Sequence, residues 1–126
     1  PFLSNGLGFD LILILLSTDI RSVNLIEVCK KYNINKYFLS DIWYNYYKKE
    51  QYQEPHIHDG NGGVTAVHYL IFDSKKHSKT CFNNIETPKI NEGDILFFPD
   101  NLEHFVPENK TDSPRLTIAF TITKIN

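Results

Sequence analysis

The sequence lacks the features that mark membrane-spanning, secreted and nucleic-acid-binding proteins. Its 126 residues carry no excess of charge of one sign, since 13 Lys and Arg stand against 15 Asp and Glu. A near-neutral chain without a basic run argues against a surface suited to phosphate backbones or anionic membranes. The longest apolar run, Leu11–Leu16, is much shorter than the roughly 20 residues that cross a bilayer. We therefore expect no membrane partner and no nucleic-acid partner.

Cysteine and methionine are also scarce. Cys29 and Cys81 are the two cysteines of the chain, and they match no zinc-binding spacing. We expect two free thiols in a reducing compartment, and therefore a cytoplasmic protein, or one in the host cytoplasm if the source is viral. No positively charged segment precedes the apolar run Leu11–Leu16 and no small-residue cleavage site follows it, so we expect that this run is not a signal peptide. The sequence has no methionine, so we expect Pro1 not to be its translation start.

Aromatic residues are plentiful, and they favour a β-rich fold. Seven Tyr and nine Phe contribute to an aromatic content of 13%. The first part, 1–37, is predicted to be an apolar, irregular or strand-like segment followed by one amphipathic helix. Apolar residues at near-helical spacing place this helix at Ser22–Tyr32, with Ser22 or Asp19 as its N-cap. The size fits a single domain over residues 1–126.

A β core over about residues 38–123 follows the helix. Alternating or continuous apolar runs between turn residues predict seven or eight short strands, which indicate a β-sandwich or barrel with the helix packed outside. The expected strand segments are Trp43–Tyr47, Tyr52–His58, Val64–Phe72, Thr80–Phe82, Thr87–Ile90, Ile95–Phe98, Phe105–Val106 and Arg115–Ile122.

Three histidines of this β core form a candidate metal site. His56 and His58 are two apart, so in a strand both side chains project from one face. His104 follows a predicted strand that stops at Pro99, and it can meet the first pair if the sheet curls back as in a jelly roll. Three neutral imidazoles can hold a first-row metal and leave coordination positions open. His68 and His77 lack this context, and we interpret both as structural or surface residues.

Arg115 is the next candidate, because a cation inside an apolar strand needs an anion. It begins an alternating segment and shares a face with Thr117. An unpaired buried charge is costly, and a guanidinium can bind a ligand carboxylate in a bidentate manner. A salt bridge to Asp94 or Glu103 is the alternative.

Taken together, these residues resemble the Fe(II)/2-oxoglutarate-dependent dioxygenases, in particular the small oxygenases related to prolyl hydroxylases. The resemblance covers residues 43–122. It runs from Gln51 through His56-x-His58 and Tyr69-Leu70 to Gly93–Pro99, His104 and Arg115-x-Thr117. It implies a double-stranded β-helix, with iron held by His56, His58 and His104. It also implies that Arg115 binds the distal carboxylate of 2-oxoglutarate with help from Tyr69 and Thr117, and that Tyr47 lies in the pocket.

One position departs from the family pattern, which is His-x-Asp/Glu. Here His58 stands where a carboxylate is usual, so the metal would have three histidine ligands and one more positive charge overall. Asp59 is adjacent, but strand alternation turns it away unless the strand ends or bulges at His58. We therefore expect His58 to be the ligand, with Asp59 as the alternative.

The resemblance implies an enzyme, a dioxygenase that hydroxylates an unidentified substrate, of which prolyl or other peptidyl groups are examples. Its partners would be the small cosubstrate 2-oxoglutarate and that substrate. The alternatives are a metal-binding cupin and a non-catalytic jelly-roll binding module. A cupin fits less well, because the glutamate of its first motif is missing after His58, where Asp59–Gly63 stands. The sequence specifies neither the substrate nor the oligomeric state.

Overall fold

The computed structural model describes residues 2–4, 13–15, 25–58 and 63–125 of the chain. Most of the regular structure in these residues is β-strand, and one short helix lies before the third strand. The elements are β1 (Phe2–Ser4), β2 (Leu13–Leu15), α1 (Leu25–Lys31), β3 (Tyr37–Tyr47), β4 (Gln53–His56), β5 (Val64–Ile71), β6 (Cys81–Phe82), β7 (Ile95–Pro99), β8 (His104–Val106) and β9 (Arg115–Lys124).

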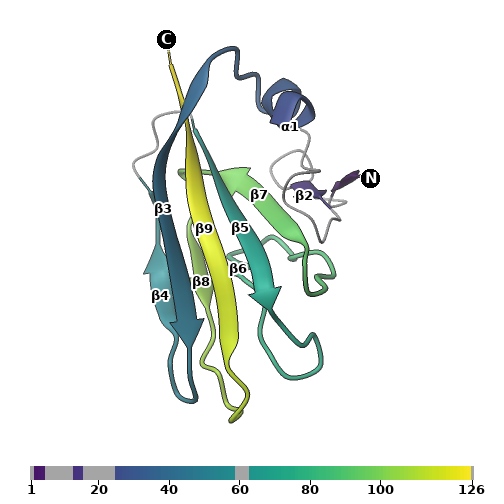
Figure 1. The fold of residues 1–126 in the computed structure, drawn as a ribbon, viewed down its shortest axis with the longest axis vertical. Helices are drawn as coiled ribbons and strands as arrows, with labels where there is room; N and C mark the ends of the chain where they lie inside the picture. Colours follow the sequence, from purple (N-terminus) through teal and green to yellow (C-terminus); the bar gives the residue numbers. More distant parts are fainter. Residues whose placement is uncertain (1, 5–12, 16–24, 59–62, 126) are drawn as a thin grey trace.

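The strands form two antiparallel sheets. The larger sheet has the order β1-β2-β7-β5-β9-β3, and the smaller has the order β4-β8-β6. The long strands β3, β9 and β5 lie side by side, the small sheet lies behind them, and α1 lies at one end (Figure 1). Two facing antiparallel sheets are the architecture of a jelly roll. The prediction of a mainly β fold with one N-terminal helix is confirmed.

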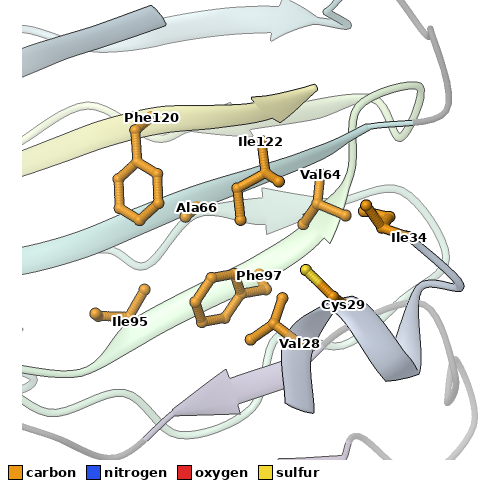
Figure 2. Packing of buried hydrophobic residues seen from close by; sticks show 9 residues of the cluster. All are labelled: Val28, Cys29, Ile34, Val64, Ala66, Ile95, Phe97, Phe120 and Ile122. Carbon is orange, nitrogen blue, oxygen red and sulfur yellow. The ribbon is translucent and has the colours of Figure 1, made fainter. Parts of the chain in front are cut away.

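Period-two alternation along β5, β7 and β9 sends apolar side chains to both faces of the large sheet. One set packs with the helix on the outer face (Figure 2); it consists of Val28, Cys29, Ile34, Val64, Ala66, Ile95, Phe97, Phe120 and Ile122. The second set faces the small sheet and consists of Val67, Tyr69, Phe72, Phe82, Ile90, Leu96, Phe98 and Ala119. The second set lies on the same side as the candidate site, so the core between the sheets supports it.

Several element boundaries differ from those expected. Strand β3 begins at Tyr37, whereas the sequence predicts it from Trp43. Strand β4 ends at His56, two residues early, after a register irregularity between Gln53 and His56. The segment Thr87–Ile90 forms no strand, and Pro88 within it lacks the N–H that a ladder requires.

The helix α1 ends at Lys31, one residue before the predicted Tyr32, and the start of the predicted helix with both proposed N-caps lies outside the described residues. Of the entry segment 1–19, only β1 and β2 are described. Cys29 and Cys81 are free, as expected. None of the described helices is long and apolar enough to span a membrane. The single-domain interpretation of the whole chain stays a prediction.

Candidate metal and cosubstrate site

The structure brings His56, His58 and His104 together. One ring nitrogen from each lies within 4.8 Å of the others. The ring centroids of His56 and His104 are 4.1 Å apart, and the rings of His58 and His104 stack at 5.1 Å. The small sheet produces this meeting, because β4 and β8 pair with His56 directly opposite His104. Among the described residues, no carboxylate joins this cluster.

Backbone carbonyls set the orientation of two of these rings. His56 Nδ1 lies 2.9 Å from Glu54 O, and His104 Nδ1 lies 2.9 Å from Leu102 O. A carbonyl oxygen can only accept, so each Nδ1 must carry the hydrogen. In the neutral ring, Nε2 is then unprotonated, and its lone pair can bind a metal ion. Metal-binding histidines are commonly held in this way by their second nitrogen.

His104 is buried and resists protonation. Burial, together with the neighbouring His56 and His58, lowers its pKa to about 4, and the hydrogen bond to Leu102 O opposes this only in part. Its ring also lies against Phe98, with centroids 4.6 Å apart. At neutral pH His104 is therefore uncharged, which is the state that binds a metal ion.

His58 lies beyond the end of β4, so strand alternation alone does not position it. Its backbone N–H donates to Asp100 O over 3.0 Å, and its ring lies 5.5 Å from that of Trp43. The turn after β7 and the inner face of β3 thus hold it beside the other two histidines. The alternative ligand Asp59 lies outside the described residues.

Arg115 is almost completely buried, with 2% of its surface exposed. Its Nε donates to Ser78 O over 2.9 Å, whereas its Nη2 is buried without a hydrogen-bond partner among the described residues. Burial lowers the pKa of the guanidinium, although Tyr69 and Tyr47 partly oppose this. A guanidinium stays protonated in proteins, so Arg115 offers a cation with a spare donor.

The alternative for Arg115, a salt bridge to Asp94 or Glu103, is absent from the described residues. Asp94 accepts instead from the backbone N–H of Asn91 over 2.8 Å. Glu103 accepts from Asn83 over 2.8 Å. That alternative is therefore wrong, and in the part of the chain that the structure describes the charge of Arg115 has no carboxylate partner.

The aromatic candidates surround this guanidinium. Its carbon lies 5.3 Å from the ring centroids of both Tyr47 and Tyr69, a cation–π distance. Burial raises the pKa of each tyrosine. Thr117 is buried and points to the same side as Arg115. All four predicted cosubstrate residues thus lie in one region.

A single cavity connects the two halves of the site. Its lining includes the three histidines together with Tyr47, Arg115 and Thr117. Trp43, Asn45, Gln53 and Thr80 also line it, and the sequence pattern predicts no role in the cavity for the last three. The alternation of Trp43, Asn45 and Tyr47 along β3 could have indicated the first two, because all three share one face.

The other two histidines lie elsewhere. His77 is buried, accepts a hydrogen bond from Asp73 N–H at Nδ1 and donates from Nε2 to Ser113 O. It is structural rather than a surface residue. His68 is buried on the opposite face of β5 from Tyr69, and Nε2 has no partner among the described residues. Neither contributes to the cluster.

A family model described as "Putative 2OG-Fe(II) oxygenase" matches residues 71–121, a stretch that includes His104, Arg115 and Thr117. The chain has the fold and part of the sequence pattern of the 2OG-Fe(II) oxygenases. The predicted resemblance and the jelly-roll fold are confirmed. No curated protein matches the sequence.

Solved structures of this family share the fold at low identity. One is a viral collagen prolyl hydroxylase from Paramecium Bursaria Chlorella virus-1 in its 2OG complex, with 19% identity, a TM-score of 0.61 and coverage of 81% of this chain and 69% of the other. Another is an oxidoreductase of the 2OG-Fe(II) oxygenase family from Burkholderia pseudomallei, with 12% identity, a TM-score of 0.62 and coverage of 92% and 70%.

The residues present fit the two groups that the family implies, Fe(II) and 2-oxoglutarate. Three inward imidazoles suit a divalent first-row metal. The orphaned Nη2 of Arg115 suits a carboxylate. The departure is the third histidine, which replaces the carboxylate of the usual two-histidine set.

Proposed function

We propose that this protein is an Fe(II)- and 2-oxoglutarate-dependent dioxygenase that hydroxylates an unidentified substrate. His56, His58 and His104 would hold the iron, and Arg115 would bind the distal carboxylate of 2-oxoglutarate. The observation that carries the proposal is one cavity lined by three clustered imidazoles and by a buried cation with an unused donor. The family model over residues 71–121 supports it.

When bound, iron with 2-oxoglutarate and dioxygen supplies the oxidising chemistry, with succinate and carbon dioxide as coproducts. The protein supplies geometry. His56 and His104 are held by carbonyls so that Nε2 is free to bind metal. Because all three ligands are neutral, the site keeps the full charge of the metal, which favours an anionic cosubstrate.

Arg115 fixes the far end of the cosubstrate. Tyr47 and Tyr69 flank its guanidinium, and Ser78 O holds its Nε, so that Nη2 is left for the ligand. Trp43 and Phe98 lie against His58 and His104 and limit the access of water to the metal ligands. A desolvated cation attracts a carboxylate more strongly than an exposed one does.

Succinate formation tests the proposal. The purified protein with Fe(II), 2-oxoglutarate and air should release succinate, and His104→Ala should abolish the release. His68→Gln is the matched control, because His68 is a buried histidine outside the cavity, and this variant should retain activity. Metal binding that is indifferent to 2-oxoglutarate would instead indicate a cupin-type protein. A protein that binds neither Fe(II) nor 2-oxoglutarate would be a non-catalytic binding module.

Peptidyl proline is the first substrate to test, since the viral structural neighbour is a collagen prolyl hydroxylase. A cytoplasmic location and the absence of a nucleic-acid partner remain parts of the proposal that rest on composition alone. The oligomeric state is open.

A further inference from the structure

The hydroxyl of Tyr69 is already used by hydrogen bonds within the protein. It donates to Thr80 Oγ1 over 2.6 Å and accepts from the backbone N–H of Thr80 over 3.0 Å. Tyr69 is fully buried and is not among the described residues that line the cavity. Its hydroxyl hydrogen is therefore not available to a ligand.

Thr80 has the spare donor. Because Oγ1 accepts from Tyr69, its own hydrogen must point elsewhere, and no acceptor for it occurs among the described residues. Thr80 is only 2% exposed, yet it lines the cavity. A buried hydroxyl without an acceptor is unfavourable, so a ligand that accepts this hydrogen would be stabilised.

The chain around Thr80 is held in place beside Arg115. Two residues earlier, Ser78 O accepts from Arg115 Nε. On the other side, Thr87 Oγ1 donates to Thr80 O over 2.5 Å. Lys79 Nζ donates to Thr87 O over 2.8 Å. These bonds fix the backbone of Thr80, and the hydrogen bond from Tyr69 orients its hydroxyl.

We propose that Thr80 is a cosubstrate-binding residue, which donates its hydroxyl hydrogen to the carboxylate that Arg115 binds. Tyr69 then acts as a positioning residue that orients Thr80, rather than as a direct ligand. The inference rests on the proposed 2-oxoglutarate site. The guanidinium and the hydroxyl both donate hydrogen bonds here. The subsite therefore favours a ligand group that only accepts hydrogen bonds, such as a carboxylate, over an amide, whose NH₂ group would face these donors.

Calorimetric titration of the anaerobic Fe(II)-loaded protein tests this without turnover. Thr80→Val removes the donor at nearly constant shape and should weaken 2-oxoglutarate binding by roughly ten- to a hundredfold, the range for a hydrogen bond to a charged group. Thr80→Ser keeps the donor and should bind within a few-fold of wild type. Thr121→Val is the matched control, because Thr121 is a buried threonine of β9 that does not line the cavity; it should bind normally.

The analogue 2-oxobutyrate, which lacks the distal carboxylate, separates recognition from folding. Thr80→Val should bind it as the wild type does. Equal weakening of both ligands, or wild-type affinity of Thr80→Val for 2-oxoglutarate, would overturn the assignment of Thr80. Absence of 2-oxoglutarate binding in the Fe(II)-loaded wild type would instead contradict the proposed function itself.

Tyr69→Phe tests the positioning role. This variant leaves the cavity lining unchanged but frees the Thr80 hydroxyl to rotate. It should weaken the binding of 2-oxoglutarate severalfold and leave the binding of 2-oxobutyrate unaffected. The double variant with Thr80→Val should bind 2-oxoglutarate no more weakly than Thr80→Val alone. Additive losses in the double variant would show that Tyr69 contacts the ligand independently.

Discussion

Arg115 is the residue whose surroundings most clearly require a ligand. It is buried, its charge has no carboxylate partner among the described residues, and Nη2 is unused. The sequence could indicate this, because an arginine in an alternating apolar strand is unusual. It could not indicate that Ser78 O would take up Nε, since that contact depends on how the segment before β6 folds back.

Replacement of Arg115 by lysine should separate cosubstrate binding from metal binding. Lysine keeps the charge but loses the planar pair of donors. Arg115→Lys should therefore lower the affinity for 2-oxoglutarate by at least about tenfold. Fe(II) affinity, measured by anaerobic titration, should stay at the wild-type value. Loss of Fe(II) binding in this variant would show that Arg115 supports the histidine cluster instead.

His68 should make the stability of the protein depend on pH. Burial lowers its pKa, with a smaller opposing effect from Asp94. The unfolded chain, with an ordinary histidine pKa of about 6.5, therefore binds more protons than the native state below that pH. His68 thus destabilises the native state as the pH falls below about 6.5, and the lowered pKa of His104 acts in the same direction.

The His68→Leu variant should reduce this acid sensitivity. Urea unfolding at pH 7.5 and pH 5 should show a smaller loss of stability for His68→Leu than for the wild type. His77→Leu offers no equivalent control, because His77 makes two hydrogen bonds. If the two proteins lost equal stability between these pH values, the assignment of the effect to His68 would be wrong.

At the level of elements, Asn109 joins the end of β3 to the segment that leads into β9. Its side-chain nitrogen donates to Tyr47 O over 3.0 Å and to Ser113 O over 2.9 Å. Its Oδ1 accepts from both the backbone and the hydroxyl of Thr111. Since β9 begins at Arg115, this loop residue helps to place both Tyr47 and Arg115 in the site.

Asn109→Ala should therefore destabilise the protein by about 2–3 kcal/mol, because it removes four side-chain hydrogen bonds, one of them to the buried Tyr47 O. Asn83→Ala is the matched control. Asn83 is exposed and bonds only to Glu103 in the described residues, so its loss should cost within about 0.5 kcal/mol. Chemical denaturation of both variants checks the difference, and equal stabilities would contradict the role of Asn109.

The elements were predictable from the sequence where local pattern decides them. Buried strands β5, β7 and β9 and the helix α1 have clear apolar periodicity, and they form near the expected residues. The first half of β3 was missed because its residues are exposed and do not alternate. The prediction of a strand at Thr87–Ile90 is wrong, because it follows the residue pattern and neglects Pro88, which cannot donate to a strand ladder.

For the whole molecule, the site exists because two sheets face one another. His56 and His104 are far apart in the chain, and only the pairing of β4 with β8 brings them opposite each other. The spacing of the histidines was consistent with many arrangements, and the family resemblance selected the jelly roll. Thr80 could not be found from the sequence, because its importance comes from its contacts with Tyr69 across the fold.

The most direct test of a joint Fe(II) and 2-oxoglutarate site is an anaerobic absorption titration. Fe(II) alone should bind once per chain without visible absorption. Addition of 2-oxoglutarate should then produce a weak visible charge-transfer band. The band should be absent in His56→Ala. The analogue 2-oxobutyrate should produce it only at a far higher concentration than 2-oxoglutarate does. Failure of Fe(II) to bind, or a spectrum that 2-oxoglutarate leaves unchanged, would contradict the account.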